Sequence, residues 1–586
     1  MIKFNPLGTA EQGECVCFRA HALRCLHPCL YLNIYSDDGS FNITEKMEWV
    51  DLTDDGEDVY EFHLDTSDMR GLYWYTAGDG VHQLSVYDKN VTPPDWYGKG
   101  VTYHVFVDRF NRGSDKVLDT DPDFYVHHNT EDIPNFRPDE INGDIFGGDL
   151  EGIRQKLPYF KSLGVKTLYL SPIFEAWSNH KYNTADFTKI DSHFGDDDDL
   201  KKLCSSAKRF GIRVILDGVF NHVGSDSIYF NREGRYDTVG AYQSWDSPYR
   251  NWFNFYNDTY ESWWGILTLP QVKENEESYK AHIADIARHW MDCGISGWRL
   301  DVADELPDEF IAHLYDVVKS KKKDALIIGE VWEDASNKVA YSVRRKYFTE
   351  RELDGVMNYP IKEAIIGFVS GWMSAEDSAN IMRTIALHYP KKVLNCLMNH
   401  IGTHDTVRAL TALARPDVGG MSREDQAYFR LSDEEIKIGK ARLKRAATLQ
   451  YSYPGSPTIY YGDEVGMQGG ADPFNRGYYP WGREDNDLCE FYRKLGTLKN
   501  KSKALQEGEF EVSVQNGALI TQRASKRQRV IFCVANGERK LYLKTNTDLY
   551  DALGGRRYRT HFGYTIVNIP EDGYLILTND KKLICK

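Results

Sequence analysis

Two charged side chains stand two positions apart in an otherwise apolar segment. Arg299 and Asp301 belong to GWRLDVADE, a segment typical of a buried β-strand. Because side chains i and i+2 project from the same face of a strand, the guanidinium and the carboxylate would point the same way. The pair alone is equally consistent with a structural ion pair and with a catalytic pair. The other segments of the chain must decide between the two.

Polar residues also end several other apolar segments of the chain. Carboxylates stand at the ends of four such segments, and histidines accompany them at two. Packing alone explains this recurrence poorly, because clustered carboxylates repel one another and are costly to desolvate. Besides Arg299 and Asp301, the residues are Asp217 and His222 (DGVFNH), Glu330 (GEVW), His404 and Asp405 (GTHDT), and His180 and Tyr182 (NHKY).

Three carboxylates accompanied by arginine and histidine suit the cleavage of a glycosidic bond. One carboxylate attacks the anomeric carbon, and a second donates a proton to the leaving oxygen and later activates water. A third can bind sugar hydroxyls. A metal-dependent hydrolase built on Asp and His is the runner-up. The sequence lacks HxH and HExxH motifs, which disfavours the metal-dependent alternative.

The same polar residues fall at the ends of eight β-like segments that alternate with amphipathic helical segments. This alternation predicts a (β/α)₈ barrel, in which chemistry is placed at the carboxyl ends of the strands. The eight segments are 101–110, 165–174, 212–220, 295–304, 325–332, 353–360, 396–405 and 457–466.

The flanking regions have a different character. Short alternating runs with Asp/Gly turns predict an N-terminal β-sandwich over residues 1–95, ended by Pro93 and Pro94. The barrel is expected over 96–505, with an inserted loop domain at 223–275 after its third strand. Short strands return over 506–586 and predict a C-terminal antiparallel β domain of sandwich type. The expected fold class is α/β.

Composition and charge narrow the function further. The chain has 586 residues, of which 41% are hydrophobic and 13% aromatic. Its net charge is −16, from 71 basic and 87 acidic residues. An acidic protein is a poor match for nucleic acid, whose binding depends on basic surface. A neutral ligand such as a sugar is compatible with this charge, and no stretch is apolar enough to predict a membrane span.

The ten cysteines are scattered, and most stand in apolar runs. Reduced thiols in a cytoplasmic protein are therefore the expectation, and the N-terminal MIKFNPLGTAEQGE has no apolar core of the kind that signal peptides carry. Cys15, Cys17, Cys25 and Cys29 stand close together near two histidines. Their spacing fits structural zinc sites poorly, so the sequence favours an alternating strand here.

The motifs, taken in order, resemble the signature regions of the α-amylase family of glycoside hydrolases. DGVFNH, GWRLDVADE, GEVW and GTHDT match four of these regions, and GVKTLYLSPIF and SPTIYYGDEVGM match two more. The similarity runs from about residue 100 to about residue 500. The N-terminal β domain, LPQVKENE (269–276) and VMNYP (356–360) make the chain most similar to the neopullulanase, cyclomaltodextrinase and maltogenic amylase group.

The resemblance implies a retaining α-glucan hydrolase and a role for each matching residue. Asp301 would be the nucleophile, Glu330 the general acid/base and Asp405 the transition-state stabiliser. The remaining matches would bind substrate or support the site: Arg299 beside the nucleophile, Asp217 behind the arginine, His222 and His404 at sugar hydroxyls, Tyr182 as a stacking platform with His180 nearby, and Trp332 as an aromatic wall on the leaving-group side.

The resemblance leaves several properties open. Expected substrates are maltooligosaccharides, cyclodextrins, starch fragments or pullulan, cleaved at α-1,4 bonds, with cleavage of α-1,6 bonds left open. An α-1,6-glucosidase, a transglycosylase and a non-catalytic glucan-binding protein are the alternatives. Some members of the group bind structural Ca²⁺, and Asn111, Asp115, Gly147 and Asp149 are the candidate ligands here. Such an N-terminal domain also implies a homodimer in which it covers the partner's cleft.

Overall fold

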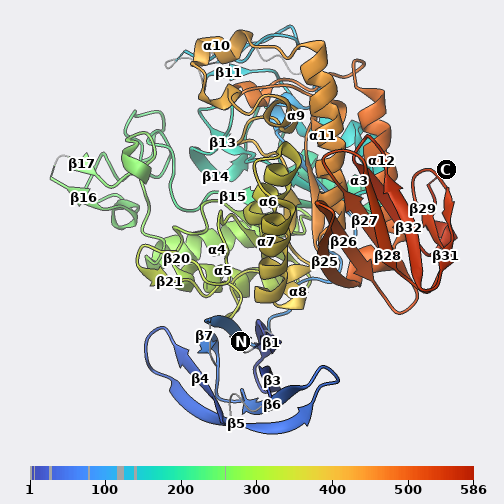
Figure 1. Ribbon diagram of the computed structural model, residues 1–586. Helices are drawn as coiled ribbons and strands as arrows, with labels where there is room; N and C mark the ends of the chain where they lie inside the picture. The colour runs from blue at the N-terminus through green and yellow to red at the C-terminus, as the bar shows by residue number, and fades with distance from the viewer. Residues whose placement is uncertain are drawn as a thin grey trace.

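A closed eight-stranded parallel barrel forms the centre of the molecule (Figure 1). The structure is a computed structural model that describes residues 3–5, 7–24, 29–76, 80–114, 124–137, 142–257 and 259–585. All eight predicted segments supply barrel strands, which confirms the predicted fold class. In sheet order the strands are β22 (Gly355–Val356), β19 (Leu326–Gly329), β18 (Gly297–Leu300), β15 (Arg213–Gly218), β12 (Val165–Leu170), β9 (Val101–Val105), β24 (Ser456–Tyr460) and β23 (Met398–His400).

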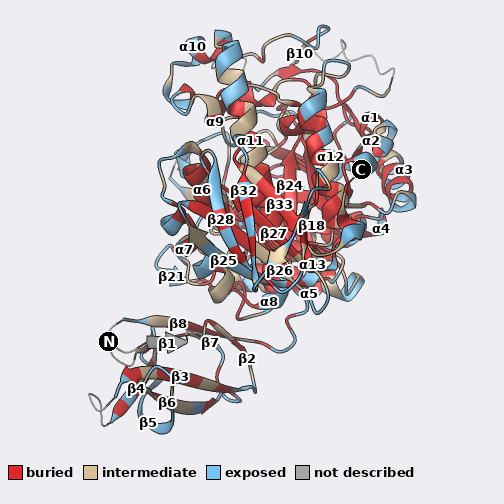
Figure 2. Ribbon diagram, turned by 45° about the vertical axis from the view of Figure 1, so that its right-hand side comes forward, coloured by how far each residue is buried: buried red, intermediate tan, exposed pale blue. Residues whose placement is uncertain are grey.

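The barrel is closed between β22 and β23. A parallel bridge joins Met357 to Met398, and the Asn358 N–H donates a 2.9 Å hydrogen bond to the Met398 carbonyl. Every strand residue of β9, β18, β19 and β24 is buried. Figure 2 shows the buried interior around β18 and β24 in red. The strands are buried on both faces, inside by barrel-filling side chains and outside by helices, which explains their continuous apolar sequences.

Amphipathic helices cover the outside of the barrel. Their ends follow capping chemistry: the Asp196 carboxylate accepts from the Asp199 N–H at the start of α3, and Ser432 and Glu435 form a capping box at the start of α11. The longer helices are α3 (Asp197–Arg209), α4 (Glu277–Asp292), α5 (Asp308–Lys321), α6 (Tyr359–Ser370), α7 (Ala375–His388), α11 (Asp433–Ser452) and α12 (Asn486–Lys501). The shorter ones are α1 (Leu150–Gln155), α2 (Leu157–Ser162), α8 (Lys391–Leu394), α9 (Ala409–Ala414), α10 (Arg423–Tyr428) and α13 (Lys503–Glu507).

The N-terminal β region folds around its own hydrophobic core (Figure 1). It contacts the barrel through the segment that follows β19: Gln83 Nε2 donates to Ser336 Oγ over 2.9 Å, and Arg344 pairs with Asp37 at 2.6 Å. Its strands are β1 (Lys3–Asn5), β2 (Thr9–Glu11), β3 (Cys15–Leu23), β4 (Leu30–Ser36), β5 (Asn42–Leu52), β6 (Glu57–Asp65), β7 (Gly71–Thr76) and β8 (His82–Tyr87).

The C-terminal sheets pack against the barrel helices. β25 contacts α7 and β27 contacts α11, so this region shares the hydrophobic core of the barrel on one side. The six-stranded sheet holds β25 (Glu509–Gln515), β26 (Ala518–Ala524), β27 (Arg529–Val534), β33 (Tyr574–Thr578), β29 (Leu549–Asp551) and β30 (Arg557–Tyr558); the three-stranded sheet holds β28 (Arg539–Lys544), β32 (Tyr564–Ile569) and β31 (Thr560–His561).

The segment after β15 contributes loops and one small hairpin rather than a barrel strand. β16 (Phe255–Tyr256) pairs with β17 (Thr259–Tyr260), and the 3₁₀ turn Trp263–Gly265 follows. In the described residues, no helix is both long and apolar enough to cross a membrane.

Gly355 tests the closure of the barrel. A Cβ at this position would lie 2.2 Å from the Cys396 carbonyl oxygen on the other side of the seam. Gly355→Ala is therefore expected to lower the free energy of unfolding by about 1–3 kcal/mol, the usual cost of overpacking. Gly420→Ala is the control, since a Cβ there meets nothing within 4 Å. Equal urea midpoints for both variants would contradict tight closure at this seam.

Candidate active site

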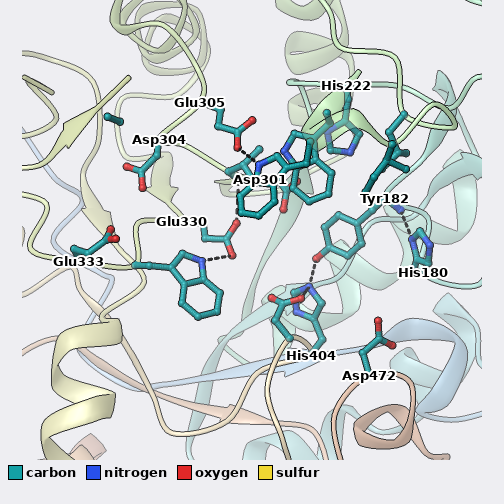
Figure 3. A pocket seen from close by; sticks show the side chains of 18 of the residues that line it. His180, Tyr182, His222, Asp301, Asp304, Glu305, Glu330, Glu333, His404 and Asp472 are labelled. Atoms are coloured by element: carbon teal, nitrogen blue, oxygen red, sulfur yellow. Dashed lines mark hydrogen bonds and ion pairs between the residues drawn. The ribbon is translucent and has the colours of Figure 1, made fainter. Parts of the chain in front are cut away.

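A pocket of about 990 Å³ opens at the carboxyl ends of the barrel strands. Its size is at the upper end of the range for small-molecule sites. Figure 3 shows Tyr182 and His180 on one side of Asp301, and Asp304 and Glu333 on the other. Eight of the ten catalytic and substrate-binding residues predicted from sequence line the pocket: His180, Tyr182, His222, Asp301, Glu330, Trp332, His404 and Asp405.

The other two predicted residues, Arg299 and Asp217, lie beneath the floor of the pocket. Arg299 is fully buried, and its Nη1 contacts Asp301 Oδ1 at 2.7 Å and Asp217 Oδ1 at 2.8 Å. Its Nη2 lies 2.9 Å from Glu330 Oε2. One guanidinium therefore contacts three carboxylates from three successive barrel strands. The predicted same-face projection of Arg299 and Asp301 is what brings the two groups into contact.

Charge in this cluster is not balanced, because three carboxylates face one guanidinium. Burial raises the pKa of Asp301 well above its usual range; the Arg299 guanidinium opposes this shift, and Glu330 adds to it. Burial likewise raises the pKa of Asp217, again against the effect of Arg299. The cluster therefore retains a proton more strongly than isolated carboxylates would. A buried acid group that holds a proton beside an ionised one is the arrangement that acid/base chemistry requires.

Hydrogen bonds from tyrosines fix Asp217 in place. Tyr169 Oη donates to Asp217 Oδ2 over 2.6 Å, and Tyr182 Oη lies 2.9 Å from the same oxygen. The Tyr182 hydroxyl is also 2.6 Å from His404 Nε2, and the two rings stack at 5.1 Å with 9° between their planes. The floor of the pocket is thus one connected network that runs from Arg299 to His404.

The backbone after Asp301 adopts an unusual conformation in which it donates a hydrogen bond to Glu330. Val302 has φ 41°, a left-handed conformation that is costly for a β-branched residue. In this conformation its N–H donates to Glu330 Oε2 over 2.9 Å. Trp332 Nε1 donates to the other oxygen of Glu330 over 3.2 Å, and its ring stacks on Tyr359 at 4.0 Å. Both Glu330 oxygens are therefore held in defined positions.

Asp405 also lines the pocket, 3.3 Å from His404 Nε2, and its side chain is 31% exposed. Protein surrounds the carboxylate on most sides, and this burial, together with the charge of Glu330, raises the pKa of Asp405 to about 7. Arg476 opposes the shift from 3.9 Å. Sequence reasoning did not identify Arg476, because it stands far along the chain in a loop after the eighth strand.

The three pocket histidines are neutral. Burial lowers the pKa of His180 to about 3 and of His222 to about 4, and it lowers the pKa of His404 well below its usual range. His222 Nε2 and His404 Nδ1 are buried and have no hydrogen-bond partner among the described residues. Neutral imidazoles with a free nitrogen suit hydrogen bonding to the hydroxyl groups of an uncharged ligand.

Two exposed aromatic residues flank the rim and were missed in the sequence. Trp264 and Tyr341 are 79% and 73% exposed, and both have left-handed backbone with φ 51°. Trp264 Nε1 donates to Glu305 Oε1 over 2.8 Å. Burial and the Glu305 carboxylate raise the pKa of Tyr341, which places Tyr341 beside the same group. The two aromatics come from different loops, so no local pattern pairs them.

The residues proposed for calcium have other partners. Asp149 caps α1, and its oxygens accept from the Gly113, Ser114 and Gly152 N–H groups and from the Ser114 hydroxyl. Asn111 Nδ2 donates to the Gly152 carbonyl, and the Gly147 N–H donates to Asp108. The Asp149 carboxylate is therefore a poor calcium ligand here, because N–H groups and a hydroxyl already contact both of its oxygens. Asp115 lies outside the described residues, and calcium binding stays a prediction.

Comparisons with known proteins agree with this geometry. Residues 104–507 match the family described as alpha amylase, catalytic domain. The chain is 35% identical to an amylopullulanase of Thermoanaerobacter thermohydrosulfuricus over 98% of its own length and 45% of that protein, so it spans less than half of that relative. It is 33% identical to neopullulanase 2 of Thermoactinomyces vulgaris, covering 79% of this chain and 73% of that one. A solved cyclomaltodextrinase superposes over 99% of both chains with a TM-score of 0.73 and 25% identity.

Arg299→Lys tests the shared guanidinium. Lysine keeps the charge but cannot contact three carboxylates with a planar fork. If the site cleaves maltooligosaccharides, as the sequence predicts, turnover should fall by at least about 10²-fold, since small displacements of reacting groups cost this much. Because the guanidinium opposes the rise in the pKa of Asp301, weakening the contact moves the acid limb of the kcat/KM profile to higher pH. An unchanged pH profile, or a loss equal to that in the exposed control Arg415→Lys, would contradict this role.

Proposed function

The chain belongs to the α-amylase family of glycoside hydrolases, and we propose that it is a retaining hydrolase of α-glucans. The observation that carries this proposal is the contact of one buried arginine with both Asp301 and Glu330. The shared guanidinium keeps the two carboxylates close together. A short separation, about 5 Å, is typical of glycosidases that form a covalent intermediate, whereas inverting enzymes leave room for a water molecule between the groups.

In the first step Asp301 attacks the anomeric carbon of the bound sugar. The bond from this carbon to the glycosidic oxygen breaks, and Glu330 donates its proton to the departing oxygen. The Val302 N–H and the Trp332 indole keep the Glu330 carboxyl aimed at that oxygen. The Arg299 contact orients the Asp301 oxygens and stabilises their negative charge before the attack.

In the second step water releases the sugar. Glu330 takes a proton from water, the resulting oxygen attacks the anomeric carbon, and the bond to Asp301 breaks. Asp405 lines the same pocket and would bind hydroxyls of the same sugar and stabilise positive charge at its ring. Neutral His222 and His404 would donate to or accept from other hydroxyls, and Tyr182 would lie against the ring face.

The substrate class follows from the pocket and from the relatives. The pocket is large enough for several sugar units, and its rim offers Trp264, Tyr341 and Trp332 as exposed aromatic faces. The relatives are named amylopullulanase, neopullulanase and cyclomaltodextrinase. Maltooligosaccharides, cyclodextrins, starch fragments and pullulan, with α-1,4 and α-1,6 bonds, are therefore the proposed substrates. A non-catalytic glucan-binding role is disfavoured because all three carboxylates are present in the pocket.

We also propose a cytoplasmic location and a homodimer formed through the N-terminal region. All nine cysteines in the described part of the chain are free thiols, as is usual in a reducing compartment. The N-terminal region contacts the 336–350 segment that contributes Lys338 and Tyr341 to the pocket wall. A dimer built through this region would lie near the rim and favour small or cyclic substrates.

Asp301→Asn tests the assignment of the nucleophile. The amide cannot form the covalent intermediate, so we expect hydrolysis of maltotriose, cyclodextrin, panose and pullulan to fall by at least about 10⁴-fold. Melting temperature and near-ultraviolet circular dichroism should show that the fold is retained. Product analysis with the wild-type enzyme on these four substrates gives the ratio of α-1,4 to α-1,6 cleavage. Undiminished turnover in the folded variant would refute the mechanism.

Trp264→Ala tests the rim beside Glu305, where we propose that the leaving sugar or an acceptor sugar would lie. Loss of an exposed aromatic platform is expected to raise KM for maltohexaose by roughly three- to tenfold and to lower the share of transfer products. Trp245→Ala is the matched control, because Trp245 is 78% exposed and does not line the pocket. If both variants keep wild-type kinetics and product ratios, Trp264 does not contact the sugar.

A further inference from the structure

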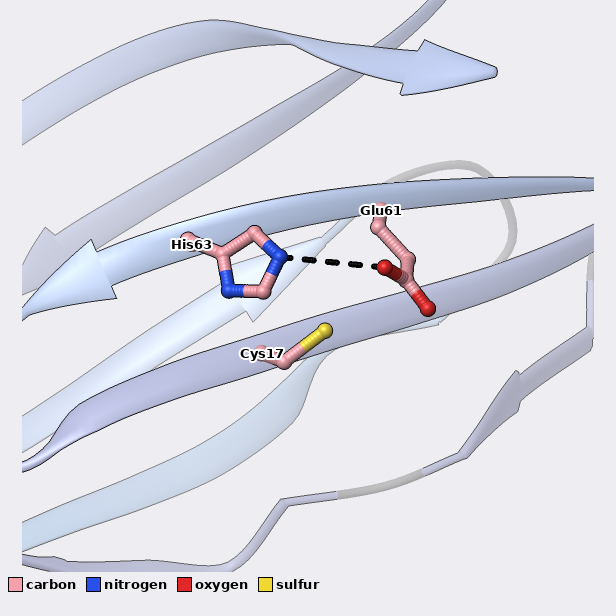
Figure 4. Close-up of side chains that lie close together, drawn as sticks. All are labelled: Cys17, Glu61 and His63. Atoms are coloured by element: carbon pink, nitrogen blue, oxygen red, sulfur yellow. Dashed lines mark ion pairs between the residues drawn. The ribbon is translucent and has the colours of Figure 1, made fainter. Parts of the chain in front are cut away.

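We propose that the outer face of the N-terminal sheet carries a binding site for Zn²⁺ or a similar transition-metal ion. Its ligands are Cys17 on β3 and Glu61 and His63 on β6 (Figure 4). One donor atom from each of these three side chains lies within 4.8 Å of the other two. None of the three residues lines the sugar pocket, so the site is independent of the proposed hydrolase function.

Strand pairing places the three side chains on one face. β3 and β6 are antiparallel, and Cys17 pairs directly with His63 while Arg19 pairs with Glu61. Glu61 and His63 stand two residues apart on β6, so they project from the same face as one another and as the cross-strand partner Cys17. The neighbouring residues Val16 and Phe18 are buried on the opposite face. The two strands therefore fix the donors without any loop.

The separation of the His63 and Glu61 donors matches tetrahedral coordination, and the Cys17 sulfur lies within 4.8 Å of both. Zinc binds nitrogen and oxygen at about 2.0–2.2 Å and thiolate sulfur at about 2.3 Å, so the ligands around a tetrahedral ion lie roughly 3.3–3.8 Å apart. His63 Nε2 and Glu61 Oε2 are 3.7 Å apart, too far for a hydrogen bond and within this range. Small rotations of Cys17 and His63, both at the surface, would bring the thiol to the same distance.

Arg19 contacts one carboxylate oxygen of Glu61 and leaves the other oxygen available to bind a metal. The guanidinium contacts Glu61 Oε1 from Nε at 2.7 Å and from Nη2 at 2.6 Å. The other carboxylate oxygen, Oε2, faces His63. A bound metal would favour the Cys17 thiolate, because metal ligands of this kind bind in the deprotonated form.

A second cluster of similar composition lacks this geometry. Asp197, His289 and Cys293 also bring their donors within 4.8 Å of one another. There, however, His289 Nε2 is 3.0 Å from Asp197 Oδ2, which is a direct hydrogen bond and shorter than a tetrahedral edge. His289 and Asp197 of that cluster are bonded directly to each other, whereas His63 and Glu61 are 3.7 Å apart.

The donor types select the class of metal. A thiolate, an imidazole and a carboxylate suit Zn²⁺ or Co²⁺ and fit the oxygen-preferring ions Ca²⁺ and Mg²⁺ poorly. His63 is 61% exposed, so a fourth position would be open to water. Three protein ligands and one open position is a common zinc arrangement. The site would join β3 to β6 near the middle of their pairing.

The test is metal binding to the full chain. Protein stripped with chelator, reduced and titrated with Co²⁺ is expected to show thiolate-to-cobalt charge-transfer absorption at one equivalent, and Zn²⁺ should displace it. Cys17→Ser should abolish the band. His63→Ala should weaken metal binding by at least tenfold, because mutation even of a residue that only hydrogen-bonds a metal ligand lowers metal affinity 10- to 100-fold. Zinc content after dialysis, measured by mass spectrometry, is the second readout.

Two controls separate this site from non-specific binding. Cys29→Ser removes another exposed thiol of the same region, and His289→Ala disrupts the second cluster; both should bind as the wild type does. Absence of a stoichiometric cobalt band in the wild type would overturn the proposal, as would wild-type affinity in folded Cys17→Ser and His63→Ala. Loss of binding in His289→Ala alone would assign the metal to the other cluster. Hydrolase activity is not a readout here, so failure of one proposal leaves the other intact.

Discussion

The active site depends on one buried guanidinium that contacts three carboxylates. Arg299 is fully buried, and desolvating it would be prohibitive without charged partners. Asp217, Asp301 and Glu330 supply those partners from three neighbouring strands. The same contacts that compensate for burial of the arginine fix the positions of Asp301 and Glu330, the two groups proposed to react. Because carboxylates outnumber the guanidinium, the cluster holds a proton more strongly than isolated carboxylates would. The charge imbalance needed to bury the arginine therefore also favours a protonated acid at the site.

The barrel makes this arrangement rigid. β15, β18 and β19 are adjacent and parallel, so their carboxyl ends present Asp217, Asp301 and Glu330 to one point. Hydrogen bonds from Tyr169 and Tyr182 hold Asp217 in place, and the Val302 N–H holds Glu330. The left-handed conformation of Val302 is costly, and the surrounding closed barrel sustains it. Strain of this kind is concentrated where geometry matters most.

Loops rather than barrel strands supply the outer part of the pocket. Trp264 comes from the segment after β15, and Tyr341 comes from the segment after β19; Glu305 lies beside both. The second of these loops also contacts the N-terminal region through hydrogen bonds to Gln83 and Asp37. The inner pocket is thus fixed by the barrel, whereas the rim depends on contacts between segments that are distant in sequence. Differences among related enzymes in substrate length and bond preference can arise at this rim without change to the chemistry below.

The sequence alone determined the barrel, the family and the residues of the inner pocket. Strand periodicity places Arg299 and Asp301 on one face, and polar residues at strand ends meet because all eight strands run in parallel. Tertiary structure alone decided the rest. It placed Trp264 against Glu305 and Arg476 near Asp405. It also placed Asp149 at the N-terminus of α1 and His63 opposite Cys17 on the neighbouring strand. These contacts join residues whose separation along the chain follows no local period, so only the folded chain brings them together.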